Sequence, residues 1–337
     1  MRAFVVTAPR TASVEDVAAP TPSAHDLVVD VERVGICGTD VEFFTGEMAY
    51  LDQGLTHYPL RLGHEWTGTV TAAGSSANDH WIGKRVTGDT MLGCGHCRFC
   101  LGGHQHVCPD RREVGITDGW AGALAEQLLI PARFAFEIPS TVSVTAAALV
   151  EPGGNSLRAV DATGLTAGEP LLILGSGTIG LLAAQFALAR GLDVHVAGER
   201  ASSLELARSL GVQHTHSFDD LDGRAYGAVI DATSSADAPA LATRLVDPAG
   251  RVVFIGLSGT PSLVDTRDIA LKDVTAVGIL SASPGLAGTI DLFASGAVVP
   301  DALVAEVIGL DEVADRLAGN RGPDAGPGPK VHVDPRA

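Results

Sequence analysis

The chain has 337 residues, of which 46% are hydrophobic and 40 are glycine, and its 23 basic and 40 acidic residues give a formal net charge of −17. This length and composition suffice for two globular domains and exclude a disordered or fibrous protein. The negative charge repels phosphate backbones and anionic lipids, so neither nucleic acid nor a membrane is an expected partner.

The first ten residues, MRAFVVTAPR, lack the sustained apolar core of a signal peptide and are typical of a β-strand. We therefore expect a cytoplasmic protein. Because the cytoplasm is reducing, its five cysteines are expected as thiols or metal ligands and not as disulfides.

Two short motifs in the first quarter of the chain carry groups that bind zinc. Cys37 lies in GICGTD (35–40), and His64 and Glu65 lie in GHEW (63–66). A catalytic zinc takes three protein ligands and leaves one position open. Spacing alone makes these motifs a weak signal, because a single cysteine in a glycine-rich loop is usually an inert thiol.

The other four cysteines lie within fifteen residues, with the spacing C-x2-C-x2-C-x7-C. Four thiolates in one short loop suit a closed, structural zinc site, and an iron–sulfur cluster is the alternative. The loop also holds His96, His104 and His106, which we expect to be exposed because four thiols already complete the shell. The expected ligands are Cys94, Cys97, Cys100 and Cys108.

The apolar run Val144–Val150 ends at a carboxylate, in the motif EPGGN (151–155). Together with Cys37 and His64, Glu151 would supply one sulfur, one nitrogen and one oxygen ligand, a set that suits a catalytic zinc.

The stretch Leu171–Ala189 is long enough to span a bilayer, but three glycines near its start indicate a strand, a turn and a helix. We expect a buried strand over 171–174, a G-x-G-x-x-G turn over 175–180, and an amphipathic helix to about Ala189. In this context the motif binds a dinucleotide, whose pyrophosphate lies on the helix N-terminus. The expected contacts are Gly175, Gly177, Thr178, Ile179 and Gly180.

A second strand, Val194–Ala197, leads to Glu199. A carboxylate there can accept hydrogen bonds from the ribose hydroxyls of NAD and repel the 2′-phosphate of NADP. The neighbouring Arg200 can tolerate that phosphate, so NAD is a preference and NADP stays possible. His195, in the middle of the strand, is expected as a core histidine and not as a ligand.

The remaining pattern alternates strands with helices, which predicts a doubly wound parallel sheet. Strands are expected at 228–231, 251–255 and 274–279, and helices at 202–210 and 236–245. A last strand is expected at 330–333, after a loop over 322–329.

These motifs, in this order, resemble the zinc-dependent medium-chain dehydrogenase/reductases, particularly the branch of polyol, threonine and sugar or cyclitol dehydrogenases. The resemblance covers nearly the whole chain. It implies an α/β protein with a GroES-like, mainly-β catalytic domain (1–152 and 286–337) and a Rossmann doubly wound parallel-sheet domain (153–285), with the active-site cleft between them. It also implies a homodimer or homotetramer.

The same resemblance implies two zinc ions per chain, a structural one on the cysteine quartet and a catalytic one on Cys37, His64 and Glu151. A catalytic zinc lowers the pKa of the substrate hydroxyl, and the nicotinamide accepts the hydride.

Further roles follow from the resemblance. Thr39 would pass the proton, Asp40 would orient His64, and Glu65 would either assist ligand exchange at the metal or form a structural ion pair. Asn155 would face the nicotinamide or the substrate. Many relatives have a histidine where this chain has Glu42, so Glu42 or water would complete the proton relay.

The expected function is therefore oxidation of a secondary alcohol of polyol, sugar or aminocyclitol type to a ketone, with NAD. The alternatives are an enzyme acting on L-threonine or on a simple secondary alcohol, and a noncatalytic NAD-binding protein. The threonine branch typically has a histidine shortly before the quartet, where this chain has Asp89, Thr90 and Met91, which counts against threonine. The intact zinc and glycine motifs count against a noncatalytic protein, and the acidic charge counts against a zinc ribbon that binds nucleic acid.

Overall fold

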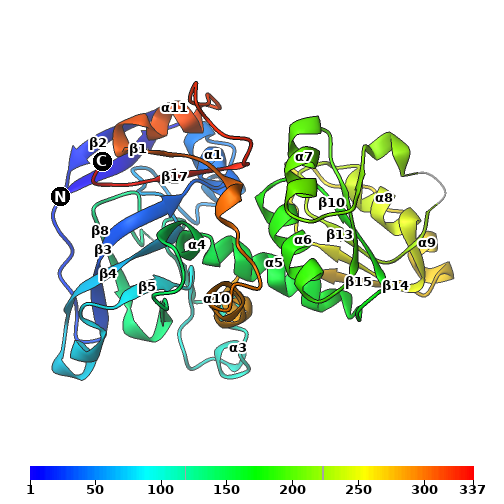
Figure 1. Ribbon diagram of the computed structural model, residues 1–337. Coiled ribbons are helices and arrows are strands. Elements are labelled where there is room, and N and C mark those ends of the chain that lie inside the picture. Colours follow the sequence, from blue (N-terminus) through cyan, green and yellow to red (C-terminus); the bar gives the residue numbers. More distant parts are fainter. Residues whose placement is uncertain (118, 222–223) are drawn as a thin grey trace.

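The computed structural model describes residues 1–117, 119–221 and 224–337. Two bodies lie side by side in Figure 1, and both chain termini belong to the same one. The body with the termini is built around a seven-stranded sheet of order β16-β17-β3-β4-β5-β9, in which β8 also pairs with β3. Its strands are β3 (Asp26–Gly35), β4 (Glu65–Ala73), β5 (Arg85–Gly88), β8 (Gln127–Pro131), β9 (Ala135–Glu137), β16 (Val304–Ile308) and β17 (Lys330–Val333).

Smaller elements complete this body. Two short hairpins pair β1 (Arg2–Ala8) with β2 (Thr11–Asp16), and β6 (Met91–Leu92) with β7 (Arg112–Glu113). The strand expected at the N-terminus is thus confirmed. The helices are α1 (Gly38–Thr45), α2 (Ala49–Asp52), α3 (Arg98–Leu101), α4 (Val144–Ala148) and α11 (Val313–Leu317). Short 3-10 segments are η1 (Ser76–Trp81), η2 (Gln105–Val107), η3 (Ala132–Phe134), η6 (Asp301–Leu303) and η7 (Leu310–Glu312).

The other body contains a six-stranded sheet of order β12-β11-β10-β13-β14-β15, in which every neighbouring pair is parallel. Its strands are β10 (Pro170–Leu174), β11 (Asp193–Ala197), β12 (His214–His216), β13 (Tyr226–Asp231), β14 (Val246–Phe254) and β15 (Thr275–Gly278). The helices are α6 (Thr178–Ala189), α7 (Ala201–Ser209), α8 (Ala238–Leu245) and α9 (Thr266–Leu271), with the short η4 (Phe218–Asp220). The α/β class and the doubly wound parallel sheet are therefore confirmed, and the expected strands and helices are present with ends shifted by a few residues.

One expectation about this body is wrong. The helix α6 is not amphipathic, because its residues Gly180–Ala187 are all buried. It packs between the sheet and α5 (Val150–Thr163), so it has almost no face toward solvent. None of the helices in the described ranges is long and apolar enough to span a membrane.

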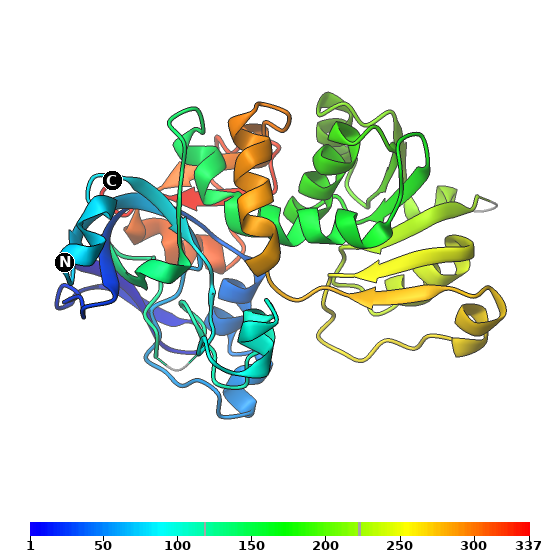
Figure 2. The ribbon, with the colours of Figure 1, turned by 90° about the horizontal axis from the view of Figure 1, so that it is seen from below.

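Two helices lie where the bodies meet. α5 leaves the mainly-β body and packs on α6, and α10 (Leu286–Ala294), which follows η5 (Ser283–Gly285), packs on α5. Figure 2 shows the chain crossing back from β15 to α10. It then ends in β17, whose predicted bounds are confirmed and which pairs antiparallel with β3 at His332 and Gly35. This return brings residues 330–333 beside the GICGTD motif.

Candidate active site

Three candidate zinc ligands meet where β3, α1 and β4 join. Ligand atoms of Cys37, His64 and Glu65 all lie within 4.8 Å of one another. The sheet explains the meeting, because β3 and β4 are antiparallel with Gly35 opposite Glu65. Cys37 is the N-cap residue of α1, and Glu65 is the first residue of β4.

Asp40 ties the two ligand-bearing turns together. One of its carboxylate oxygens, Oδ2, accepts a hydrogen bond from the backbone N–H of Cys37 (2.9 Å), and Oδ1 accepts one from that of Gly63 (3.2 Å). The side chain is fully buried, and burial raises the pKa of this carboxyl. The Nδ1 atom of His64 lies 3.7 Å from Oδ1, beyond hydrogen-bonding distance, so Asp40 positions His64 mainly through the backbone.

Glu65 forms a buried ion pair with a residue from the far end of the chain. Lys330 Nζ lies 2.8 and 2.7 Å from its two carboxylate oxygens and also donates to the carbonyl of Ile36 at 2.9 Å. Burial lowers the pKa of Lys330, but Glu65, Cys37 and Asp40 together leave it raised, so the lysine stays charged. Of the two roles expected for Glu65, the ion pair is thus present.

Glu151 lies in the first turn of α5 and is buried. Its Oε1 atom accepts a hydrogen bond from Asn155 Nδ2 at 3.0 Å. Burial, followed by the charge of Glu65, raises the pKa of Glu151 to about 7, although His64 acts in the opposite direction. Among the described residues, the cluster within 4.8 Å contains Glu65 and not Glu151.

This site suits a divalent cation. Burial lowers the pKa of His64, yet Asp40, Cys37 and Glu151 together raise it well above its usual value. The surroundings therefore favour positive charge at a position lined by sulfur, nitrogen and carboxylate donors, the ligand types that zinc takes.

The cysteine quartet forms a second, separate cluster. The sulfurs of all four cysteines lie within 4.8 Å of one another, with Cys94 to Cys100 at 3.9 Å and Cys97 to Cys108 at 3.7 Å. The backbone N–H groups of Cys97 and Cys100 point at sulfurs in the same loop. These four donors fit one closed tetrahedral zinc.

The histidines of this loop differ from one another. His96 and His104 are exposed, as expected, whereas His106 is buried. The expectation of exposure is therefore wrong for His106, which lies in η2 against the rest of the body. Burial, together with Arg158, lowers its pKa to about 4, so it is a neutral core residue.

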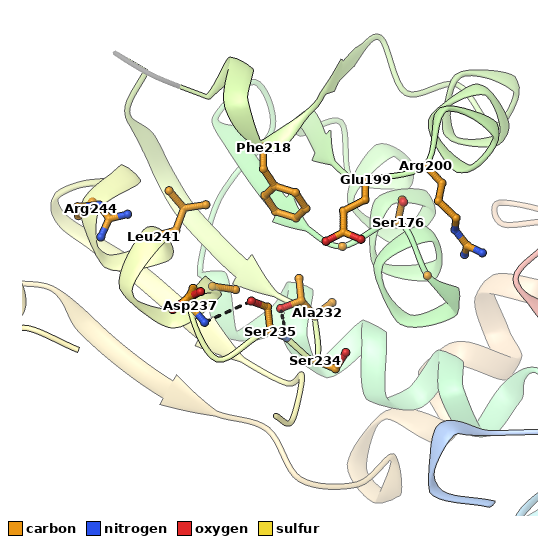
Figure 3. Close-up of a pocket in the computed structure, with 15 residues that line it drawn as sticks. Ser176, Glu199, Arg200, Phe218, Ala232, Ser234, Ser235, Asp237, Leu241 and Arg244 are labelled. Atoms are coloured by element: carbon orange, nitrogen blue, oxygen red, sulfur yellow. Dashed lines mark hydrogen bonds between the residues drawn. The ribbon is translucent and has the colours of Figure 1, made fainter. Parts of the chain in front are cut away.

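A cavity of about 550 Å³ opens at the carboxyl ends of the parallel strands (Figure 3). Its lining comes from the glycine turn, from the end of β11, from η4, and from the loop and helix after β13. The lining residues are Gly175, Ser176, Gly177, Gly198, Glu199, Arg200, Phe218, Ala232, Thr233, Ser234, Ser235, Asp237, Ala238, Leu241 and Arg244. Such a crevice is where open α/β sheets bind dinucleotides.

The glycines of the turn are required for different structural reasons. Gly175 has φ +107°, a conformation that side chains rarely adopt. A Cβ on Gly180 would lie 1.9 Å from the carbonyl oxygen of Gly175, so only glycine lets α6 pack this closely on the turn. Gly177 caps α6 and lines the cavity.

The expected cofactor residues divide into two groups. Figure 3 shows Glu199 directed into the cavity near Phe218, and Arg200 directed away from Phe218 and Leu241. Thr178, Ile179, Gly180 and Asn155 are outside the lining of the cavity. The first three begin α6 behind the turn, and the amide of Asn155 donates to Glu151.

One helix connects the two sites. α5 carries Glu151 in its first turn, and the hydroxyl of Ser156 in the next turn donates to the carbonyl of Ile179 at 3.0 Å. Because Ile179 lies in the first turn of α6, Glu151 and the glycine turn are held by adjoining helices.

Comparison with known proteins agrees with this geometry. Residues 23–140 match the alcohol dehydrogenase GroES-like domain, and residues 178–295 match the zinc-binding dehydrogenase family. L-threonine 3-dehydrogenase of Shigella sonnei (strain Ss046) is 32% identical over 275 residues, which cover 78% of this chain and 79% of that protein. The chain belongs to the zinc-dependent medium-chain dehydrogenase/reductase family.

Solved structures of this family superpose over nearly the whole chain. One from Sinorhizobium meliloti 1021, described as a zinc-binding dehydrogenase bound to NADP, has a TM-score of 0.90 at 33% identity and covers 99% of both chains. An alcohol dehydrogenase from E. coli CFT073 in complex with NADH has a TM-score of 0.89 at 26% identity, also over 99% of both chains. As a member of this family, the chain is a zinc-dependent dehydrogenase with a nicotinamide cofactor.

Sequence reasoning misses several residues of this dehydrogenase's sites. Lys330 is one of only three lysines and begins the last strand, but no local pattern links it to Glu65. Phe218, Leu241 and Arg244 line the cofactor cavity from η4 and α8, and their spacing in the sequence carries no signal.

Proposed function

We propose that this dehydrogenase oxidises a secondary alcohol of a polyol, sugar or aminocyclitol to the ketone, with NAD. The observation that carries the proposal is the α5–α6 contact, which ties the helix that carries Glu151, a buried carboxyl close enough to His64 to feel its charge, to the glycine turn of a dinucleotide cavity. A noncatalytic NAD-binding protein has no need of buried, cation-selective ligands next to that cavity.

We propose that Cys37, His64 and Glu151 hold the catalytic zinc, and that the quartet holds the structural one. A buried carboxyl with its pKa near 7 and a single amide donor gains most from a cation, which supports Glu151 as the third ligand. Glu65 is also within reach of the metal, but both its oxygens are bound to Lys330. Bound there, zinc supplies Lewis acidity that lowers the pKa of a substrate hydroxyl, and the nicotinamide accepts the hydride.

The chain's own residues handle the proton. Thr39 lies in the first turn of α1, two residues after Cys37, and is half-buried. Glu42 lies one helical turn further along α1 and is exposed, so it faces neighbouring solvent on the same side as Thr39. We propose that Thr39 takes the proton from the substrate hydroxyl and that Glu42 or water passes it on.

L-threonine is the second candidate substrate, because relatives at 32% identity are L-threonine 3-dehydrogenases. In this chain the segment 89–91 lacks a histidine. Asp89 instead accepts hydrogen bonds from Met91 N–H (2.9 Å), Gln105 (2.9 Å) and Ser283 (2.8 Å), which keeps it in a structural network. The missing histidine counts against threonine and leaves the hydroxyl-rich class as the first candidate.

NAD is the proposed cofactor because Glu199 points into the cavity. Arg200 points away from Phe218 and Leu241, which line the apolar part of the cavity. NADP remains the alternative, since Arg200 and Arg244 both line the cavity.

We propose catalytic-domain boundaries at 1–152 and 286–337, with the cofactor domain at 153–285. In support, the strands of the seven-stranded sheet come from 26–137 and 304–333, and those of the six-stranded sheet from 170–278. A homodimer or homotetramer is also proposed. Its support is the open edge of β15 together with three exposed leucines in the connection before it, Leu257, Leu263 and Leu271. All five cysteines are free, which supports a cytoplasmic location.

The test is cofactor reduction, followed by absorbance, across polyols, sugars, aminocyclitols, L-threonine and simple secondary alcohols, with NAD and NADP in parallel. Turnover of one hydroxyl-rich class with NAD is the expected result. Turnover of L-threonine alone would establish the second candidate, and silence of zinc-loaded protein across the panel would contradict both.

A further inference from the structure

A third group of potential metal ligands lies at the amino ends of β11 and β12, opposite the cofactor cavity. Ligand atoms of Asp193, His195 and His214 all lie within 4.8 Å of one another. The sheet builds this group, because His195 and His214 are direct partners on parallel strands. Asp193 precedes His195 by two residues and therefore shares its face.

The spacing of the ligand atoms matches a tetrahedral metal. Asp193 Oδ2 lies 3.4 Å from His195 Nε2, and Asp193 Oδ1 lies 3.5 Å from His214 Nε2. With metal bonds of about 2.1 Å, neighbouring ligands around a tetrahedral zinc are about 3.4 Å apart. The contact of His195 is a long hydrogen bond, and each imidazole faces a different oxygen of Asp193 at a distance close to that between atoms that share one ion.

A third histidine sets the protonation that coordination requires. The Nδ1 atom of His195 lies 3.0 Å from His216 Nε2. Without an ion, His195 Nε2 donates to Asp193 Oδ2. A bound cation requires the other tautomer, in which Nδ1 donates to His216 and Nε2 carries a lone pair toward the ion.

The group faces an open depression of about 380 Å³, which Arg224 and Tyr226 also line. Tyr226 is only 1% exposed, and its burial raises the pKa of its hydroxyl, although the charge and hydrogen bonding of Arg224 act in the opposite direction.

We propose that Asp193, His195 and His214 bind a divalent transition metal such as Zn²⁺, with water in the fourth position. Two imidazoles and one carboxylate are borderline ligands suited to such ions. The ion lies at the opposite end of the sheet from the cofactor cavity, so its role is to link the three-residue edge strand β12 to β11 and not to take part in the reaction. This gives His195 a binding role in place of the core role expected from the sequence.

The charge of the depression separates this proposal from an anion site. Asp193 attracts a cation and repels an anion. Arg224 opposes a cation, so Arg224→Gln is expected to tighten metal binding.

The test is calorimetric titration of Zn²⁺ into the zinc-loaded dehydrogenase after removal of loosely bound metal, with elemental analysis of the product. We expect one further zinc per chain in the wild type and at least a tenfold weaker affinity in both His214→Ala and Asp193→Asn. His216→Ala should lose roughly 10- to 100-fold, as outer hydrogen-bond partners of ligands do. His25→Ala, on an exposed histidine of the other body, is the control and should keep the wild-type affinity.

A second readout follows folding, because the ion should raise the unfolding temperature of the wild type and of His25→Ala but not of His214→Ala. Absence of the further zinc in the wild type, or its retention in both ligand variants, would overturn the proposal. Weaker binding in Arg224→Gln, together with heat from added inorganic phosphate that this variant abolishes, would establish an anion site instead.

Discussion

The two cysteine-containing sites of this dehydrogenase are assembled in opposite ways. The quartet comes from fifteen consecutive residues whose own backbone N–H groups point at the sulfurs. The open cluster of Cys37, His64 and Glu65 joins residues at the end of β3 and the start of β4, and it is completed by the ion pair of Glu65 with Lys330 from the far end of the chain. A closed site can therefore be built locally, whereas an open site depends on the whole fold to hold its charges.

The substitution of Cys37 should have the largest effect of those considered, and it should act on turnover. Cys37→Ala should lower turnover by about 10³-fold or more, because Lewis acidity worth several kcal/mol is lost with the metal. One zinc per chain should be lost and the unfolding temperature should change little. Initial rates, zinc content and a thermal melt of the same sample measure this, and full activity with two zinc ions would contradict it.

The buried pair of Glu65 and Lys330 tests how the fold holds the open site. Lys330→Met leaves the carboxylate buried without its partner, which should lower the free energy of unfolding by about 3–5 kcal/mol. Denaturant unfolding measures the loss. The double variant Glu65→Gln/Lys330→Met is the control and should recover most of it, and equal losses in both variants would show that the charge is not the cause.

Loss of a cysteine of the quartet should lower stability and leave turnover nearly unchanged, the opposite of what is expected for Cys37→Ala. Cys97→Ala should remove one zinc and lower the free energy of unfolding by more than about 2 kcal/mol, because a structural zinc contributes directly to folding. Turnover per folded molecule should stay close to the wild-type value. A loss of turnover as large as that of Cys37→Ala, in protein that is still folded, would break the distinction between the sites.

The burial of His332 should make the stability of the protein depend on pH. His332, on the strand beside the open cluster, is fully buried, and burial followed by Lys330 lowers its pKa to about 3. Below its ordinary pKa of 6.5 the unfolded chain takes up a proton that the folded protein refuses, so stability is complete above pH 6.5 and falls as the pH drops. At pH 5 this loss amounts to roughly 2 kcal/mol.

The free energy of unfolding of His332→Leu, measured between pH 7 and pH 5, tests the contribution of His332 to this loss of stability. In this variant the slope of the unfolding free energy against pH should correspond to about one proton less than in the wild type. The surface change His25→Ala is the control. An unchanged slope in His332→Leu would mean that His332 is already charged in the folded protein.

Much of the cofactor body follows from the sequence because its signals are local. The strand, glycine turn and helix over 171–189 are consecutive, and Glu199 follows the next strand directly. The buried character of α6 could also have been read from its sequence, because TIGLLAAQFALA has no charged residue and lacks the polar face of an amphipathic helix.

The open site shows where sequence reasoning stops. The pair of Glu65 and Lys330 spans 265 residues, and only the antiparallel return of β17 beside β3 brings them together. The burial of His106 and the group around His195 likewise arise from contacts between segments that have no shared pattern. Spacing identifies donors, and the fold decides which of them meet.

We propose that Cys37, His64 and Glu151 would hold the zinc that activates a secondary alcohol, and that NAD accepts the hydride. Zinc content and NADH formation, measured together on wild type, Glu151→Gln and Glu65→Gln, test it most directly. The account predicts two tightly held zinc ions and turnover in the wild type, with one zinc and nearly all turnover lost in Glu151→Gln while Glu65→Gln keeps both ions. Two retained zinc ions and unchanged turnover in Glu151→Gln would contradict it.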